Sequence, residues 1–165
     1  MQSKRLLFGL FILIPAIIFL AGCERSHDHD NGHEELEEVR IIDRSNNQII
    51  GTWTHADGWD VDVLYELSES AEEDRTRVSL GARIFNNHGD EIPLGRNEEF
   101  EVRYWLAQDA QEGIIDFSFT DDQLYHGDHV HIYGLAQGET EIEFTLWHGG
   151  HADAATTPVT FRVIE

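Results

Sequence analysis

The chain has 165 residues, a formal net charge of −21 at pH 7, 11 basic residues and a single cysteine. This composition excludes a nucleic acid as partner, because a phosphate backbone needs a basic footprint, and one cysteine excludes an internal disulfide. Such acidity favours solubility and attracts cations, although adaptation to high salt would also explain it.

Residues 1–22 have the pattern of a secretory signal. Lys4 and Arg5 precede the apolar run Leu6–Leu20, and the small residues Ala21 and Gly22 follow it. The apolar run is shorter than the roughly 20 residues that a membrane-spanning helix needs. We therefore expect this segment to be a cleaved signal peptide and not a stable membrane span.

The end of this run, Leu20-Ala21-Gly22-Cys23, resembles the lipobox of bacterial lipoproteins. The resemblance implies cleavage before Cys23, lipidation of Cys23 and attachment to a membrane through several acyl chains. Glu24 stands where an inner-membrane retention signal typically has aspartate, which favours the outer membrane, facing the periplasm or the surface. The alternative is an ordinary signal peptide with an incidental cysteine.

Residues 23–38 are predicted to be a disordered acidic tether, because the segment holds one sizeable apolar side chain, Leu36, and cannot bury enough surface to fold. The tether also contains His27, His29 and His33. Short tracts of histidine and acidic residues bind divalent metals loosely. Both a simple spacer and a spacer that captures metal fit this composition.

From Val39 onward, apolar residues recur at every second position in short segments separated by Gly, Asn and Asp. The segments are centred on residues 39–43, 48–54, 61–67, 78–84, 100–106, 115–119, 130–132, 142–146 and 159–163. This period is typical of strands that are buried on one face. With no room for crossover helices, it predicts an all-β fold, an antiparallel Ig-like β-sandwich over residues 39–165. A small barrel and a tandem of two small sandwiches are the alternatives.

The segment Val130–Val163 resembles the closing strands of bacterial Ig-like domains, in which a Gly-Leu-Ala-x-Gly link joins two strands. Here the link is Gly134-Leu-Ala-Gln-Gly138. The chain departs from that pattern by inserting the turn Trp147-His-Gly-Gly-His151. The resemblance implies the fold and a role as an exported module, and it carries no functional site.

The stretch from His126 to Asp153 holds five of the ten histidines. We expect it to form one β-hairpin, in which His129 and His131 lie on the outer face while Val130 and Ile132 face the core. In either allowed register of that hairpin, Glu143 lies across from one of the two histidines. Two imidazoles and a carboxylate in cross-strand reach would suit a divalent transition metal, zinc or copper.

A second group is predicted at the far end of the hairpin. His148 and His151 flank two glycines that permit a tight turn, Asp153 follows, and His126 is expected near the same edge. At about 3.3 Å per residue, His131 and His148 would be roughly 15 Å or more apart. The histidines therefore form two metal sites, or only one of the groups binds metal.

Two classes of function follow. The first is a lipid-anchored metal-binding protein of the cell envelope, with a partner in metal transport or another envelope protein. The second is a structural or protein-interaction Ig-like module in which the histidines pair with nearby carboxylates. The sequence contains no H-E-x-x-H and no G-x-S-x-G motif, so we do not expect an enzyme.

Overall fold

The computed structural model describes residues 35–68, 77–117 and 125–165, so the predicted signal peptide, Cys23 and the tether histidines lie outside the described residues. Within these ranges the chain forms twelve β-strands and no α-helix. Accordingly, no helix in the described part is long and apolar enough to cross a membrane. The predicted all-β class is confirmed.

The first sheet has seven strands in the order β3-β2-β1-β5-β9-β8, with β6 paired to β5. All of its pairings are antiparallel. Its strands are β1 (Leu36–Asp43), β2 (Gln48–Thr54), β3 (Gly58–Trp59), β5 (Arg77–Asn86), β6 (Glu91–Ile92), β8 (Ile115–Asp116) and β9 (His129–Gly134).

The second sheet is built around its longest strand, β10. One edge of β10 pairs with β7, and the other edge pairs with β12 at its start and with β11 at its end. The strands are β4 (Val63–Ser68), β7 (Phe100–Leu106), β10 (Gly138–His148), β11 (His151–Ala155) and β12 (Val159–Ile164). The pairing of β12 with β4 is parallel, which the expected antiparallel arrangement did not include.

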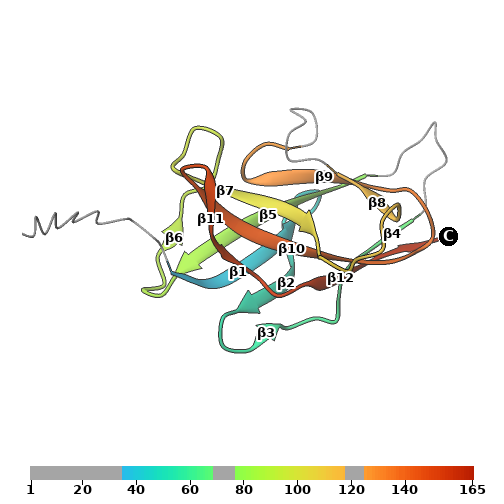
Figure 1. Ribbon diagram of the computed structural model, residues 1–165, viewed down its shortest axis with the longest axis horizontal. Coiled ribbons are helices and arrows are strands. Elements are labelled where there is room, and N and C mark those ends of the chain that lie inside the picture. Colours follow the sequence, from blue (N-terminus) through green and yellow to red (C-terminus); the bar gives the residue numbers. More distant parts are fainter. Residues whose placement is uncertain (1–34, 69–76, 118–124) are drawn as a thin grey trace, which may run out of the picture. The chain divides into compact units, whose positions relative to one another are not determined.

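The two sheets pack face to face around one core (Figure 1). Alternate residues of each strand point inward, which is why the apolar positions recur with a period of two. The largest fully buried side chains come from both sheets: Val39, Ile41, Leu80, Ile84, Val130, Ile132, Val102, Tyr104, Ile142, Phe144, Leu146 and Phe161. The buried Tyr104 hydroxyl on β7 donates a hydrogen bond to the Leu80 carbonyl on β5 at 3.1 Å. This architecture confirms the predicted β-sandwich.

The domain begins earlier than the sequence pattern indicates. β1 starts at Leu36 and not at Val39, and the Leu36 side chain belongs to the buried core. A register shift between Leu36 and Glu38 interrupts the alternation, so that Leu36 and Val39 are both buried although they are three positions apart. Residues 36–38 therefore belong to the sandwich.

The expected hairpin between β9 and β10 does not exist. β9 pairs with β5 and β8 in the first sheet, whereas β10 lies in the second sheet. The link from Gly134 to Gly138 therefore carries the chain from one sheet to the other. As a result, the histidines of β9 and those at the end of β10 lie on different layers of the sandwich.

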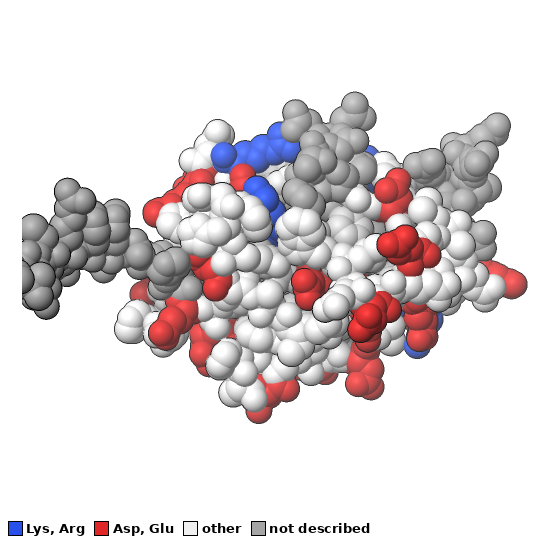
Figure 2. All heavy atoms as spheres, viewed as in Figure 1, with Lys and Arg blue, Asp and Glu red and all other residues white. Residues whose placement is uncertain are grey.

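Acidic side chains are scattered over the visible face of the molecule, while basic ones gather mostly toward its upper edge (Figure 2). The net charge of −21 is therefore not evenly distributed. The electrostatic potential therefore differs from one part of the surface to another.

Candidate metal centre

His129 and His131 are on the outer face of the first sheet. The residues that alternate with them, Val130 and Ile132, are fully buried, so the predicted orientation of this strand is confirmed. Across the strand pair, His129 faces Gly81 and His131 faces Ser79, both on β5. The cross-strand position expected for Glu143 is therefore wrong.

A tight turn brings His126 to the same place. Gly127 has a φ of +89°, and a Cβ atom there would lie 2.4 Å from the Arg96 backbone nitrogen, so only glycine fits. The backbone N–H of His126 donates to the His129 carbonyl at 3.0 Å. The imidazole of His126 consequently stacks on that of His129, with 4.4 Å between ring centroids. The prediction that His126 lies near the same edge as His148 is therefore wrong.

The three side chains His126, His129 and His131, called the histidine triad below, form a plausible set of metal ligands. One nitrogen of each ring lies within 4.8 Å of one nitrogen of each other ring. A tetrahedral zinc ion holds two imidazole nitrogens about 3.3 Å apart, so modest rotations of the side chains would close the set. The Nδ1 atom of His131 is buried and makes no hydrogen bond within the described residues, which leaves its lone pair or its proton without a protein partner.

The environment of the triad favours neutral imidazole, which is the form that binds metal. Desolvation lowers the pKa of His129, against the opposing effect of the Asp128 carboxylate. Desolvation also lowers the pKa of His131, and the positive charge of Arg77 adds to this effect. Protons therefore compete less for these two rings than for an exposed histidine.

Asp128 and Arg44 hold the ring of His129. Asp128 Oδ1 lies 2.7 Å from His129 Nδ1, and Arg44 Nη1 donates to Asp128 Oδ2 at 2.8 Å. Desolvation raises the pKa of Asp128, but the hydrogen bonds from His129 and Arg44 outweigh it and bring that pKa below its ordinary value. The carboxylate is thus ionised at neutral pH and can accept a hydrogen bond from the imidazole.

The contacts of the His129 Nδ1 atom are compatible with two tautomers. Its Nδ1 atom also lies 2.9 Å from Arg44 Nη1, so it can either accept from Arg44 or donate to Asp128. Donation to Asp128 leaves Nε2 with a free lone pair directed away from the carboxylate. Metal-ligating histidines commonly donate their other ring N–H to a carboxylate in this way.

We predict that Asp128→Asn weakens zinc binding by the triad about 10-fold to 100-fold, the usual effect of losing such a carboxylate. The amide accepts a weaker hydrogen bond from Nδ1–H than a charged carboxylate does. His129 is therefore held less firmly in the orientation and tautomer that leave the Nε2 lone pair free for the metal ion. Calorimetric titration of zinc measures the change. Asp116→Asn, on the neighbouring strand β8, is the control, and equal losses in both variants would contradict a specific role for Asp128.

His148, His151 and Asp153 form a second set, called the hairpin cluster below. Gly149 and Gly150 have φ values of +55° and +95°, as a two-residue β-hairpin turn requires. The turn pairs His148 with His151 across the hairpin of β10 and β11. Asp153 completes the set, and its side chain is 1% exposed. The predicted grouping of these three residues is confirmed.

In contrast to the triad, the hairpin cluster supplies its histidines with carboxylate partners. His151 Nε2 lies 2.8 Å from Asp153 Oδ1, and His148 Nδ1 lies 3.5 Å from Asp153 Oδ2. On its other side, His148 Nε2 lies 3.2 Å from Glu99 Oε1. Histidine–carboxylate pairing explains these positions without a metal ion, although the same atoms could bind one.

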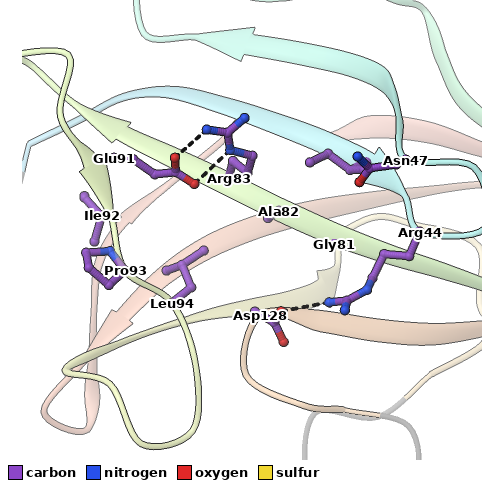
Figure 3. Close-up of a pocket in the computed structure, with 11 residues that line it drawn as sticks. Arg44, Asn47, Gly81, Ala82, Arg83, Glu91, Ile92, Pro93, Leu94 and Asp128 are labelled. Atoms are coloured by element: carbon purple, nitrogen blue, oxygen red, sulfur yellow. Dashed lines mark hydrogen bonds and ion pairs between the residues drawn. The ribbon is translucent and has the colours of Figure 1, made fainter.

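Beside the triad, the outer face of the first sheet has an open hollow of about 590 Å³ (Figure 3). Arg44 crosses Gly81 to reach Asp128 on one side, and Arg83 pairs with Glu91 on the other. Both guanidinium groups of the hollow are therefore already matched by carboxylates. The described residues that line the hollow therefore offer no uncompensated charge to a ligand.

Sequence reasoning named all members of both clusters but missed Asp128 and Arg44. The adjacency of Asp128 and His129 is a usable signal, because an acidic residue next to a histidine can reach its ring. Arg44 carries no such signal, since 84 residues separate it from Asp128. Glu143 was assigned to the β9 histidines, and the structure places it opposite Trp105 in the other sheet.

No protein-family model matches the chain, and no curated protein matches it. Among solved structures, one similar chain is described as "Crystal structure of the S-layer protein SbsC domains 4 and 5". The similarity covers 64% of this chain and 49% of that chain, with 13% sequence identity and a TM-score of 0.35. The chain thus spans about half the length of that structure.

Proposed function

We propose that this chain is an exported, lipid-anchored protein of the cell envelope that binds a divalent transition metal ion, zinc or copper, through the histidine triad. The observation that carries the proposal is the convergence of three imidazole nitrogens within 4.8 Å of one another. Imidazole is the side chain that both metals use most readily. The role is binding and not catalysis, and the partner is a metal-transport component or another envelope protein.

The triad supports this function better than the hairpin cluster does. Its three imidazole rings contact one another, and among the described residues Asp128 is the one carboxylate that pairs with a ring of the triad, whereas two carboxylates pair with the histidines of the hairpin cluster. The hairpin cluster, Asp153 included, is a second site of mixed nitrogen and oxygen ligands in the same proposal. Glu143 is not part of either site.

The test is a calorimetric titration of zinc and copper into the mature chain with His27, His29 and His33 replaced by alanine, because the tether could bind metal by itself. We expect binding tighter than about 100 μM, or about −5.5 kcal/mol. His148→Ala/His151→Ala is expected to retain the stronger site, and His129→Ala/His131→Ala to lose it. If the parent protein binds neither metal more tightly than about 100 μM, the proposal is wrong.

A second candidate is a structural or protein-interaction module without metal function. The specific observation in its favour is the hairpin cluster, where carboxylates already pair with both histidines. On this view the acidic protein uses histidines as partners for its own carboxylates. An unchanged metal titration in both double variants would favour this candidate.

Zinc binding by the triad is predicted to persist to lower pH than an ordinary histidine site allows. The pKa values of His129 and His131 lie below the ordinary value of 6.5, so these two rings take up protons at lower pH than an exposed histidine does. Protons should therefore begin to compete with zinc for these two ligands at lower pH than at an ordinary histidine site, and the affinity should fall as the pH drops below about 6.5. Titrations at pH values on both sides of about 6.5 decide the point, and a decline that starts well above about pH 6.5 would contradict it.

The anchor proposal rests on the lipobox-like run that ends at Cys23. We predict that the wild-type protein fractionates with membranes, specifically the outer membrane, and that Cys23→Ser releases it, because a serine cannot form the thioether to lipid. Cell fractionation followed by immunoblotting measures the distribution. A wild-type protein found entirely in the soluble fraction would show that Cys23 is incidental.

A further inference from the structure

The arginines of the described chain gather near the histidine triad. Four of the seven lie on or beside the outer face of the first sheet: Arg40, Arg44, Arg77 and Arg83. Arg77 and Arg83 alternate along β5 with the buried residues Val78 and Ile84, so their side chains point to the same face as His129 and His131. Most of the described arginines therefore lie on the face that carries the candidate metal centre.

Arg77 differs from the other three. Arg40, Arg44 and Arg83 each pair with a carboxylate. Arg77 is exposed, and its side chain makes no ion pair or hydrogen bond within residues 35–68, 77–117 and 125–165. An arginine without a carboxylate partner on so acidic a domain is available to an anion from outside the chain.

The register places Arg77 next to the triad. Arg77 pairs with Tyr133 and Ser79 pairs with His131, so Arg77 is the diagonal neighbour of His131 on the same face. Diagonal neighbours are about 7 Å apart, which a long side chain can span. After desolvation, the charge of Arg77 is the largest cause of the lowered pKa of His131, and Ser79, the residue opposite His131, is two positions from Arg77 along β5.

A metal ion held by three imidazoles keeps an open coordination position. Neutral histidines do not reduce the double positive charge of the ion, and Asp128 is balanced by Arg44. The metal-loaded triad and Arg77 together therefore present two positive centres on one face of the first sheet. A guanidinium group matches a carboxylate or a phosphate, whose oxygens can also ligate zinc.

We propose that the metal-loaded triad binds a small oxyanion, a carboxylate or a phosphate, which ligates the metal ion with one oxygen and accepts hydrogen bonds from Arg77 with another. This inference rests on the proposed function, since without the metal ion Arg77 alone is too weak an anion site. It assigns to Arg77 the role of anion-binding residue. It also gives the metal centre a ligand class, free anions or the acidic side chains of a partner.

The test uses cobalt(II) as a spectroscopic substitute for zinc in the mature chain, with the tether histidines and His148 and His151 replaced by alanine so that the triad alone binds metal. Acetate and inorganic phosphate are titrated separately in a buffer that does not coordinate cobalt. We expect a saturable change in the visible absorption of cobalt with at least one of the two anions. A response to acetate alone indicates a carboxylate ligand, and a response to phosphate alone indicates a phosphate ligand.

Arg77→Gln is expected to weaken the anion response about tenfold, the usual effect of losing a charged hydrogen-bond partner, while the affinity for cobalt itself stays the same or rises. Arg162→Gln, which alters a half-buried, ion-paired arginine of the second sheet, is the control and should leave the response unchanged. If cobalt binds but neither anion changes its spectrum, or if Arg77→Gln responds as the parent does, the inference is wrong. A failure of cobalt to bind at all overturns the metal proposal first.

Discussion

Replacing His131 by alanine is expected to weaken zinc binding at the histidine triad by more than about 100-fold. This loss exceeds the one expected for removing a carboxylate that only orients a metal-ligating histidine. His131 lies on a strand whose neighbouring residues are fully buried, so its backbone cannot shift to let another side chain take its place. The two remaining imidazoles would hold the ion with one ligand fewer. A competition titration against a chelator of known affinity measures the loss in the protein that lacks the tether histidines.

Stability provides an independent measure of the same loss. A ligand that binds only the folded state adds about 2.7 kcal/mol to the free energy of unfolding when its free concentration is 100 times the dissociation constant. Zinc should stabilise the parent protein by this amount, and the His131→Ala variant far less at the same zinc concentration. His88→Ala, an exposed loop histidine, is the control. If His88→Ala reduces the stabilisation by zinc as much as His131→Ala does, the triad is not the zinc site.

Phe144→Ala is expected to lower the free energy of unfolding by about 3–5 kcal/mol, the range for removing a buried aromatic ring. The Phe144 side chain is 1% exposed on the central strand of the second sheet. Its ring contacts Tyr104 at 5.0 Å and Trp59 at 5.5 Å between centroids. The alanine would leave a cavity between the two sheets that rigid strands cannot fill.

Urea denaturation gives the free energy of unfolding for both this variant and its control. Phe85→Ala is the matched control, because Phe85 lies on the outer face of β5 with the Arg40 guanidinium 4.4 Å from its ring centroid. Removing the Phe85 ring should lower the free energy of unfolding by about 1 kcal/mol or less. Equal losses in the two variants would contradict the assignment of inner and outer faces.

The orientation of each strand could be predicted from the sequence because it is a local property. Successive side chains of a strand point to opposite faces, so the buried pair Val130 and Ile132 places His129 and His131 outside whatever strand pairs with β9. The same reasoning recognised the hairpin of His148 and His151, since two consecutive glycines permit positive φ angles. Both results depend on residues within a few positions of one another.

The partner of each strand could not be predicted in this way. β9 and β10 are consecutive, and consecutive strands often pair, but β9 pairs with β5 some 50 residues earlier in the chain. The alternation of apolar residues is the same whichever strand lies beside it. The pattern therefore did not reveal that β10 belongs to the other sheet, and the assignment of Glu143 failed for this reason.

The sequence by itself determined the all-β class, the faces of the strands and the identity of the histidines. Only the tertiary structure decided how they group: His126 joins the triad because Gly127 packs against the backbone of Arg96, and Asp128 is held by Arg44 from a distant turn. Side-chain direction follows from local backbone geometry. The neighbours across the sheet follow from the packing of the whole core, which no short segment encodes.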